Sequence, residues 1–172
     1  MTEAEHRYTP ARETTTSEVP PELARYLDGT DLLAKTQALR LSTIDAAGWP
    51  HASLLSVGDM FAMPSGRIRF ALLAKSGMAA NLARDGRLTL TLSIDGGMCE
   101  LRLKARRLTT PPDETSLAFF EAEPVMTRIH VAPYADVVSG ITFTLHEPQA
   151  VLPRWQRQIA ALRAATDANS ET

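Results

Sequence analysis

The sequence contains a single cysteine, Cys99, so no disulfide can form within the chain. Such cysteine usage is typical of the reducing cytoplasm. No apolar run approaches the roughly 20 residues that a transmembrane helix needs. The first 22 residues are polar and charged where a secretory signal would have an apolar core. We therefore expect a cytoplasmic protein that does not associate with membranes.

The sequence also lacks the short motifs of several large enzyme classes. The four histidines are scattered and the cysteine stands alone, so the clustered ligands that a metal site needs are missing. No GxSxG elbow, P-loop or GxGxxG fingerprint occurs. Lys75-Ser76 superficially resembles the end of a P-loop but lacks its glycines. Nothing pairs a serine with a histidine and an acid, so hydrolytic chemistry has no support.

Charge is nearly balanced overall but unevenly distributed. The net charge of −2 does not favour nucleic acid as a partner. Residues 1–36 hold seven acids and four bases, whereas residues 67–107 hold nine bases and three acids. A basic centre suits a small ligand that carries a phosphate. The alternation of Arg102, Lys104 and Arg106 is equally typical of a solvated strand face, and the count alone favours that interpretation.

Alternating apolar residues and frequent turn residues predict a mainly β fold. Six strands are predicted, over residues 38–44, 51–57, 67–73, 87–94, 99–108 and 140–147. Helices are predicted over residues 22–27, 76–84 and 152–166, and from Pro111-Pro112 to a stop before Pro124. Strands joined by tight turns favour an antiparallel barrel with helices outside it. We expect residues 1–19 to form a flexible tail and residues 20–172 a single domain.

The segment FALLAKSGMAANLARDGRLTL, residues 70–90, places Lys75 and Ser76 at the start of a short helix between two strands. Unbonded N–H groups and the helix dipole favour an anion there. A lysine adds a charge-assisted hydrogen bond. A serine N-cap beside a solvated lysine needs no ligand at all. The residues themselves leave both interpretations open.

Three segments carry a resemblance to a known family. The first strand ends LSTIDAAGWP, the second reads HASLLSV, and a strand, break and helix follow as FALLAKSGMAANLARDGRL. In order and spacing they resemble the pyridoxamine 5'-phosphate oxidase-like family of FMN-binding split barrels, over about residues 36–108 and more weakly over 139–146. The resemblance implies a six-stranded antiparallel split β-barrel. It also implies a homodimer that binds FMN in the cleft between two barrels.

The resemblance also implies a cofactor site. One strand would run along the isoalloxazine ring, the next would approach it, and the helix start would hold the phosphate, with Asn81 near the phosphate or ribityl chain. The implied residues are Ser53, Leu54, Leu55, Ser56, Leu72, Leu73, Lys75, Ser76 and Asn81.

Each of these residues also fits an ordinary structural role. Ser53 and Ser56 suit plain strand positions, and Asn81 suits a cap or a solvent-facing position. His51 is either a proton source near the ring or incidental. We expect Trp155 to pack in the core and Cys99 to be a buried, inert thiol. Catalytic residues are not identified.

The sequence departs from the family's oxidases at their basic positions. Ser53 and Gly58 stand where these oxidases have an arginine and a lysine, and Gly77 and Met78 stand where they have Arg-Lys. Their C-terminal Arg-Leu-x-Pro signature is matched only weakly here, by Val151-Leu152-Pro153-Arg154. Pyridoxamine phosphate is therefore not the expected substrate.

Three hypotheses follow for function. The first is an FMN-dependent oxidoreductase that acts on a small redox substrate, with the flavin carrying the chemistry. The second is a non-catalytic flavin- or ligand-binding protein, or a dimeric interaction module, that has lost tight FMN binding. The third, ranked last, is an unrelated monomeric barrel.

Overall fold

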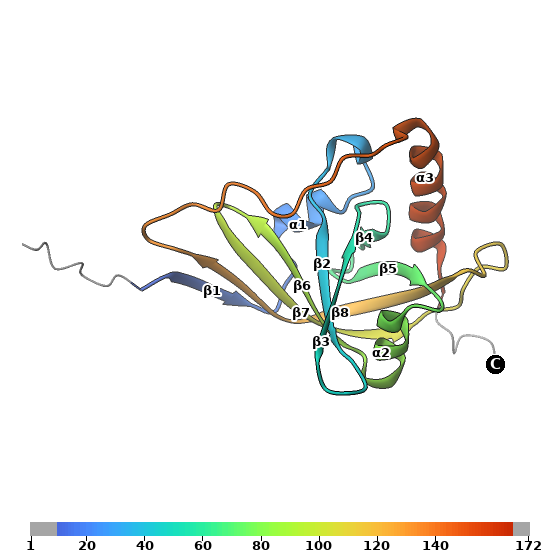
Figure 1. Ribbon diagram of the computed structural model, residues 1–172, viewed down its shortest axis with the longest axis horizontal. Coiled ribbons are helices and arrows are strands. Elements are labelled where there is room, and N and C mark those ends of the chain that lie inside the picture. Colours follow the sequence, from blue (N-terminus) through green and yellow to red (C-terminus); the bar gives the residue numbers. More distant parts are fainter. Residues whose placement is uncertain (1–9, 167–172) are drawn as a thin grey trace, which may run out of the picture.

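The computed structural model describes residues 10–166; the first nine residues of the expected tail and the last six of the expected domain lie outside the described residues. Within this range the fold is mainly β, with one curled antiparallel sheet (Figure 1). The strands are β1 (Arg12–Thr16), β2 (Leu39–Ile44), β3 (Pro50–Leu55), β4 (Met60–Ala62), β5 (Ile68–Leu73), β6 (Arg87–Ile94), β7 (Gly97–Arg107) and β8 (Leu117–Val131). The helices are α1 (Pro21–Tyr26), the 3-10 turn η1 (Leu32–Ala34), α2 (Gly77–Asp85) and α3 (Pro148–Ala164).

The sheet has the order β3-β2-β6-β7-β8-β5-β4, and β1 pairs with β8. Five predicted strands are found, as β2, β3, β5, β6 and β7. The predicted count of six is wrong, because β1, β4 and β8 were not expected and one expected strand is missing. β3 stands at one end of the sheet order and pairs with β2. The helix between β5 and β6 and the C-terminal helix are both present as α2 and α3.

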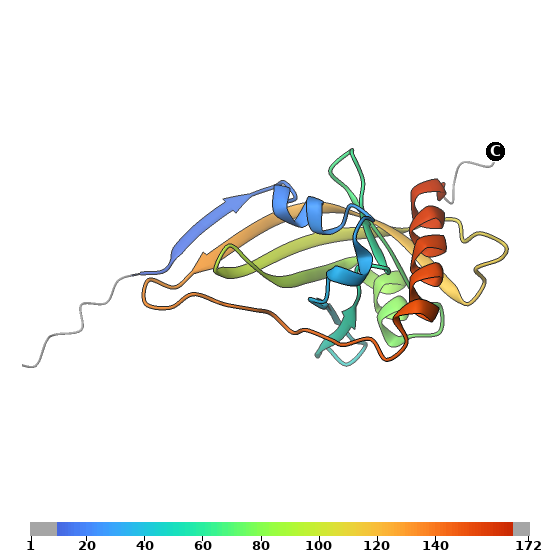
Figure 2. The same cartoon turned by 90° about the horizontal axis from the view of Figure 1, so that it is seen from above.

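The main core lies inside the curl of the sheet. β6 buries Leu88, Leu90 and Leu92 while β7 buries Cys99 and Leu101, as their alternation predicts. A second apolar cluster lies beneath α3 and includes Phe119 and Ile159. Figure 2 shows α3 at the opposite end of the molecule from β1.

The predicted helix after Pro111-Pro112 is wrong, because this segment leads into β8. Phe119 and Phe120 follow each other in sequence, and both are buried. Phe120 stacks on Phe70 in the main core with ring centroids 5.5 Å apart, whereas Phe119 belongs to the cluster under α3. A strand covered on both faces has a continuous apolar run, which periodicity alone does not separate from a buried helix.

Pro124 does not end an element but sits at a β-bulge within β8. Arg102 pairs with Met126 and Leu103 pairs with Pro124, so Val125 is the extra residue on β8. Proline cannot donate to the ladder, and a bulge is one of the places where a sheet tolerates it.

The predicted strand over 140–147 is also wrong. It lies in a long connection, residues 132–147, which we call the strap and which leads from β8 to α3. A single bridge joins Thr142 to Gln37, and the Ala38 N–H donates to the Ile141 carbonyl at 2.7 Å. Phe143 and Leu145 of the strap pack beside Trp155 instead of forming a sheet face, whereas Ile141 is exposed.

The expected tail includes one strand, β1, formed by Arg12–Thr16. All five residues are exposed, so the strand has no apolar face that periodicity could detect. Its backbone pairs with β8 over five positions, from Arg12 opposite Val131 to Thr16 opposite Thr127. Three consecutive β-branched threonines suit this extended conformation.

Candidate functional site

The start of α2 lies directly after β5 and carries two of the predicted residues. Ser76 is the N-cap, and its Oγ accepts a hydrogen bond from the Ala79 N–H at 3.2 Å. Lys75 is exposed and has no hydrogen bond or ion pair with any residue from 10 to 166. The capping role of Ser76 is thus realised, and Lys75 stands beside it with its ammonium unpaired.

His51 of β3 reaches the same helix start. A Cβ atom built on Gly77 would lie 2.9 Å from the His51 Cε1, so the glycine allows the imidazole to lie against the first turn of α2. The Asn81 Nδ2 lies 3.4 Å from the His51 Nδ1. Because an amide nitrogen can only donate, Nδ1 accepts and a neutral ring carries its proton on Nε2. Sequence patterns gave no signal for this contact, which joins residues far apart in the chain.

Asn81 is buried and ties α2 to the sheet. Its Nδ2 donates to the Thr43 Oγ1 at 3.0 Å, and its Oδ1 accepts from the Arg84 guanidinium at 3.3 Å. Arg84 also donates to the carbonyl of Ile44. These contacts engage both ends of the Asn81 amide within the chain and hold α2 against β2.

The predicted residues of β3 and β5 divide by exposure. Leu55 and Leu72 are buried in the main core. Leu54 is 54% exposed and Leu73 is 67% exposed, both high values for leucine. Ser53 is half-buried.

Ser56 follows β3 and is engaged in a turn. Its backbone N–H and its Oγ both donate to the Asp59 Oδ2, at 2.8 and 2.7 Å. Its hydroxyl proton is thereby committed to Asp59 and is not available to a ligand in this arrangement.

Two concave regions flank these residues. A groove of about 700 Å³ crosses β2, β6 and β7 and includes the basic residues Arg87, Arg102 and Lys104. None of the nine predicted residues lines it. A smaller pocket of about 320 Å³ lies at the end of β3 and includes Leu54, Leu55 and Ser56 from the predicted set.

Asp85 and Cys99 have shifted pKa values, which fix their protonation states near neutral pH. Hydrogen bonds from Arg87 lower the pKa of Asp85, at the rim of the groove, to about 2. This carboxylate is therefore ionised and paired near neutral pH. Burial raises the pKa of the Cys99 thiol to about 11, so Cys99 stays protonated and is a poor nucleophile, as expected.

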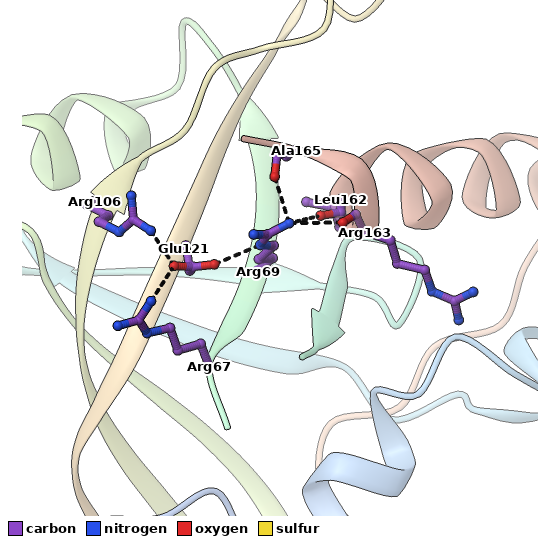
Figure 3. Close-up of polar contacts among 7 residues, drawn as sticks. All are labelled: Arg67, Arg69, Arg106, Glu121, Leu162, Arg163 and Ala165. Atoms are coloured by element: carbon purple, nitrogen blue, oxygen red, sulfur yellow. Dashed lines mark hydrogen bonds and ion pairs between the residues drawn. The ribbon is translucent and has the colours of Figure 1, made fainter. Parts of the chain in front are cut away.

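A second polar cluster, around Glu121, anchors α3 (Figure 3). Glu121 is 4% exposed and pairs with Arg67 at 3.2 Å, Arg69 at 2.8 Å and Arg106 at 2.5 Å. Arg69 also donates to main-chain carbonyls at the end of α3, including those of Leu162 and Ala165, each at 2.9 Å. These carbonyls lack intrahelical partners, so Arg69 caps the helix and links it to Glu121.

Within residues 10–166, no group of three or more histidine, cysteine, aspartate or glutamate side chains is arranged to hold a metal ion. Over the same range, none of the helices is both long and apolar enough to cross a membrane.

No family model matches the sequence. Structures with similar folds include an F420 reductase, with 12% identity and a TM-score of 0.45 over 55% of this chain and 92% of that one. Another is a Lactobacillus delbrueckii protein provisionally named a pyridoxamine 5'-phosphate oxidase, with 14% identity and a TM-score of 0.49 over 65% of this chain and 94% of that one.

A closer relationship appears at the level of sequence. The chain is 34% identical over 143 residues to the uncharacterized protein YclD of Bacillus subtilis (strain 168). The alignment covers 82% of this chain and 93% of YclD. Identity of this extent along nearly the whole relative places the chain in the same family as YclD.

Proposed function

We propose that the protein binds FMN and acts as an FMN-dependent oxidoreductase on a small-molecule substrate. The observation that carries this proposal is the gathering of His51 and Lys75 around the first turn of α2, at one end of the edge strand β3. The family resemblance of the sequence motifs gives the same assignment for the helix start.

The helix start suits a phosphate group. The first N–H groups of a helix have no intrahelical partner, which here applies to Gly77 and Met78 ahead of the capped Ala79. The unpaired Lys75 ammonium adds a charge-assisted contact. The Nε2–H of His51 supplies a further donor beside the same turn. These groups would hold the phosphate of FMN.

β3 suits the remainder of the cofactor. From His51 to Ser56 an extended strand covers about 17 Å. Its unpaired edge offers backbone N–H and C=O groups to a polar ring edge, and the exposed Leu54 and Leu73 offer apolar contacts. When bound, the flavin supplies hydride transfer, while the chain supplies binding and orientation.

We further propose a homodimer with the cofactor cleft at the subunit interface. The exposed leucines Leu54 and Leu73 would then be covered by the second copy. Leu54→Glu should yield a monomer by light scattering, whereas Ala83→Glu, an exposed change on α2, should not alter the mass. If Leu54→Glu leaves the mass unchanged, β3 does not form part of the dimer interface.

A second function is favoured by the contacts of Ser56 and Asn81. Both side chains are bonded within the chain, and the basic residues of the family's oxidases are absent from positions 53, 58, 77 and 78. These side chains are therefore not available to a cofactor. This favours a non-catalytic flavin- or ligand-binding protein, which would need fewer contacts to its ligand.

A visible absorption spectrum distinguishes these functions. The purified protein is mixed with FMN, passed through a desalting column and measured before and after adding NADH or NADPH. Retained flavin that is bleached by the donor supports the oxidoreductase. Retained flavin that no donor reduces supports the binding protein, and a colourless eluate removes FMN from both.

A further inference from the structure

The amide of Asn81 lies against two side chains of the sheet at once. Thr43 of β2 and His51 of β3 are directly opposite each other in the antiparallel pair, so their side chains share one face of the sheet. The Asn81 Nδ2 lies 3.0 Å from the Thr43 Oγ1 and 3.4 Å from the His51 Nδ1. An amide nitrogen carries two N–H groups, so it has one for each of these atoms.

Arg84 determines which way this amide faces. The oxygen and nitrogen of an asparagine would exchange places if the amide turned over. The Arg84 guanidinium lies 3.3 Å from the Asn81 Oδ1 and also donates to the carbonyl of Ile44. A guanidinium has donors only and stays charged, so a turned amide would set Nδ2 against another donor. The oxygen therefore faces Arg84, and the nitrogen faces Thr43 and His51.

The direction of the amide in turn fixes the proton of His51. Because Nδ2 only donates, the His51 Nδ1 accepts and carries no proton, and the neutral ring has its proton on Nε2. This Nε2 has no hydrogen-bond partner among residues 10–166, and they do not enclose it. It is therefore a donor that a ligand can reach, on a ring that lies against Gly77 at the start of α2.

We propose that Asn81, oriented by Arg84, is a positioning residue that fixes His51 as a hydrogen-bond donor to the phosphate of the cofactor. This inference rests on the proposed function, because it takes the start of α2 as the phosphate site. Asn81 touches no ligand and acts only through the imidazole ring. The group bound at Nε2 must be an acceptor, which suits a phosphate oxygen and excludes an ammonium group.

The first test needs no ligand. Long-range 1H–15N spectra of the full-length protein at about pH 8, where an unperturbed imidazole is neutral, show which ring nitrogen of each histidine carries a proton. His51→Gln assigns the His51 signals. The His51 Nδ1 should be unprotonated in the wild type and protonated in Asn81→Asp, because a carboxylate only accepts.

His130 on β8 is the internal reference for these spectra, and its signals should be the same in both proteins. A protonated His51 Nδ1 in the wild type, or an unprotonated one in Asn81→Asp, would overturn the proposal. Neither result depends on whether the protein binds FMN.

The second test measures the donor at Nε2. FMN and riboflavin differ only in the phosphate, so the ratio of their dissociation constants, from fluorescence titrations, isolates the phosphate contacts. His51→Ala should reduce the preference for FMN about tenfold. His51→Gln, whose amide places a donor near the position of Nε2, should keep the preference within about threefold of the wild type. His51→Asn is the matched control, because its shorter amide reaches only the position of Nδ1, and it should behave like His51→Ala.

A double-mutant cycle shows whether Asn81 acts through His51. Asn81→Ala should lower the preference for FMN at least about threefold in the wild type and should have no further effect in His51→Ala. Equal reductions in both backgrounds, or none in the wild type, would give Asn81 a purely structural role and overturn the proposal. Equal losses for His51→Gln and His51→Asn would overturn the donor at Nε2. If the wild type shows no preference for FMN over riboflavin, the proposed phosphate site is wrong, and the first test alone decides whether Asn81 orients His51.

Discussion

The polar clusters around Glu121 and at the start of α2 use their cations in opposite ways. Around Glu121, three arginines converge on one buried carboxylate, and Arg69 uses its remaining donors on the end of α3 (Figure 3). At the start of α2, Lys75 has no such partner within the described residues. The first arrangement is complete as it stands, whereas the second presents unused donors to solvent.

This difference separates structural from functional charge more reliably than a count of basic residues does. Arg67, Arg69 and Arg106 all belong to the basic stretch 67–107, which suggested an anionic ligand. Their shared partner is Glu121, outside that stretch. The cations of this stretch that remain candidates for ligand binding are those without an internal acid, such as Lys75.

Glu121→Ala should have the largest effect, because it leaves Arg69, which is 12% exposed, without its counter-ion. We expect the free energy of unfolding to fall by about 3 kcal/mol, as for other broken buried pairs. Urea denaturation measures this change. Glu123→Ala, an exposed change on the same strand, should stay within about 0.5 kcal/mol. Equal losses for the two variants would show that the cluster contributes no special stability.

Lys75→Ala should weaken FMN binding by about 1.5–3 kcal/mol, the strength of a charge-assisted hydrogen bond. Thermal stability should not change, because Lys75 is exposed. Fluorescence titration of FMN gives the affinity, and Lys104→Ala on β7 is the matched control. An unchanged dissociation constant for Lys75→Ala would remove the lysine from the cofactor site.

Asn81→Ala should reduce stability by about 1–2 kcal/mol, because the buried Thr43 hydroxyl loses its donor. Combining it with Thr43→Val removes both polar partners and should recover part of the loss. Urea denaturation of the two single variants and the double variant forms a complete cycle. Additive losses would show that the two side chains do not interact.

The smallest expected effect is a pH dependence that belongs to Glu121. Burial raises the pKa of Glu121, but hydrogen bonds and charges from Arg69 and Arg106 outweigh burial and hold the pKa below its usual 4.5. The folded state therefore binds the proton less readily than the unfolded state. The resulting stability is present above pH 4.5 and is lost as the pH falls through the folded-state pKa.

Urea midpoints measured from neutral pH into this acid range should fall for the wild type and fall less steeply for Glu121→Gln. Parallel curves for the two proteins would assign the acid sensitivity to other carboxylates.

The sequence was informative where one strand face is buried and the other is solvated. β6 shows this plainly, because its leucines alternate with threonines and its predicted bounds are those observed. β8 was missed because its first half is covered on both faces, by the main core and by α3. β1 was missed for the opposite reason, since all its side chains are exposed and it is held by backbone pairing with β8 and by the Glu13–Arg128 ion pair.

Only part of the candidate site could be predicted from the sequence, for a related reason. The cap at Ser76 follows from local sequence, because it joins residues three positions apart. The contacts of Asn81 with Thr43 and His51 join residues 38 and 30 positions apart, and no local pattern encodes them. Trp155 was expected to pack in the core, and it does.

The extra residue in β8 changes whether even-numbered or odd-numbered residues of the strand face the core. Before the bulge, the even-numbered residues Ala118, Phe120 and Ala122 face the core; after it, the odd-numbered Thr127 and Ile129 take that side. Deleting Val125 alone would leave Pro124 opposite Leu103 and Met126 opposite Arg102 with no residue between them, so the downstream residues would keep their faces and β8 would lose only the local bend of the bulge. A single-residue deletion in the regular part of β8 would instead turn the residues on one side of it to the opposite face, so the same change should be tolerated at the bulge and disruptive elsewhere in the strand.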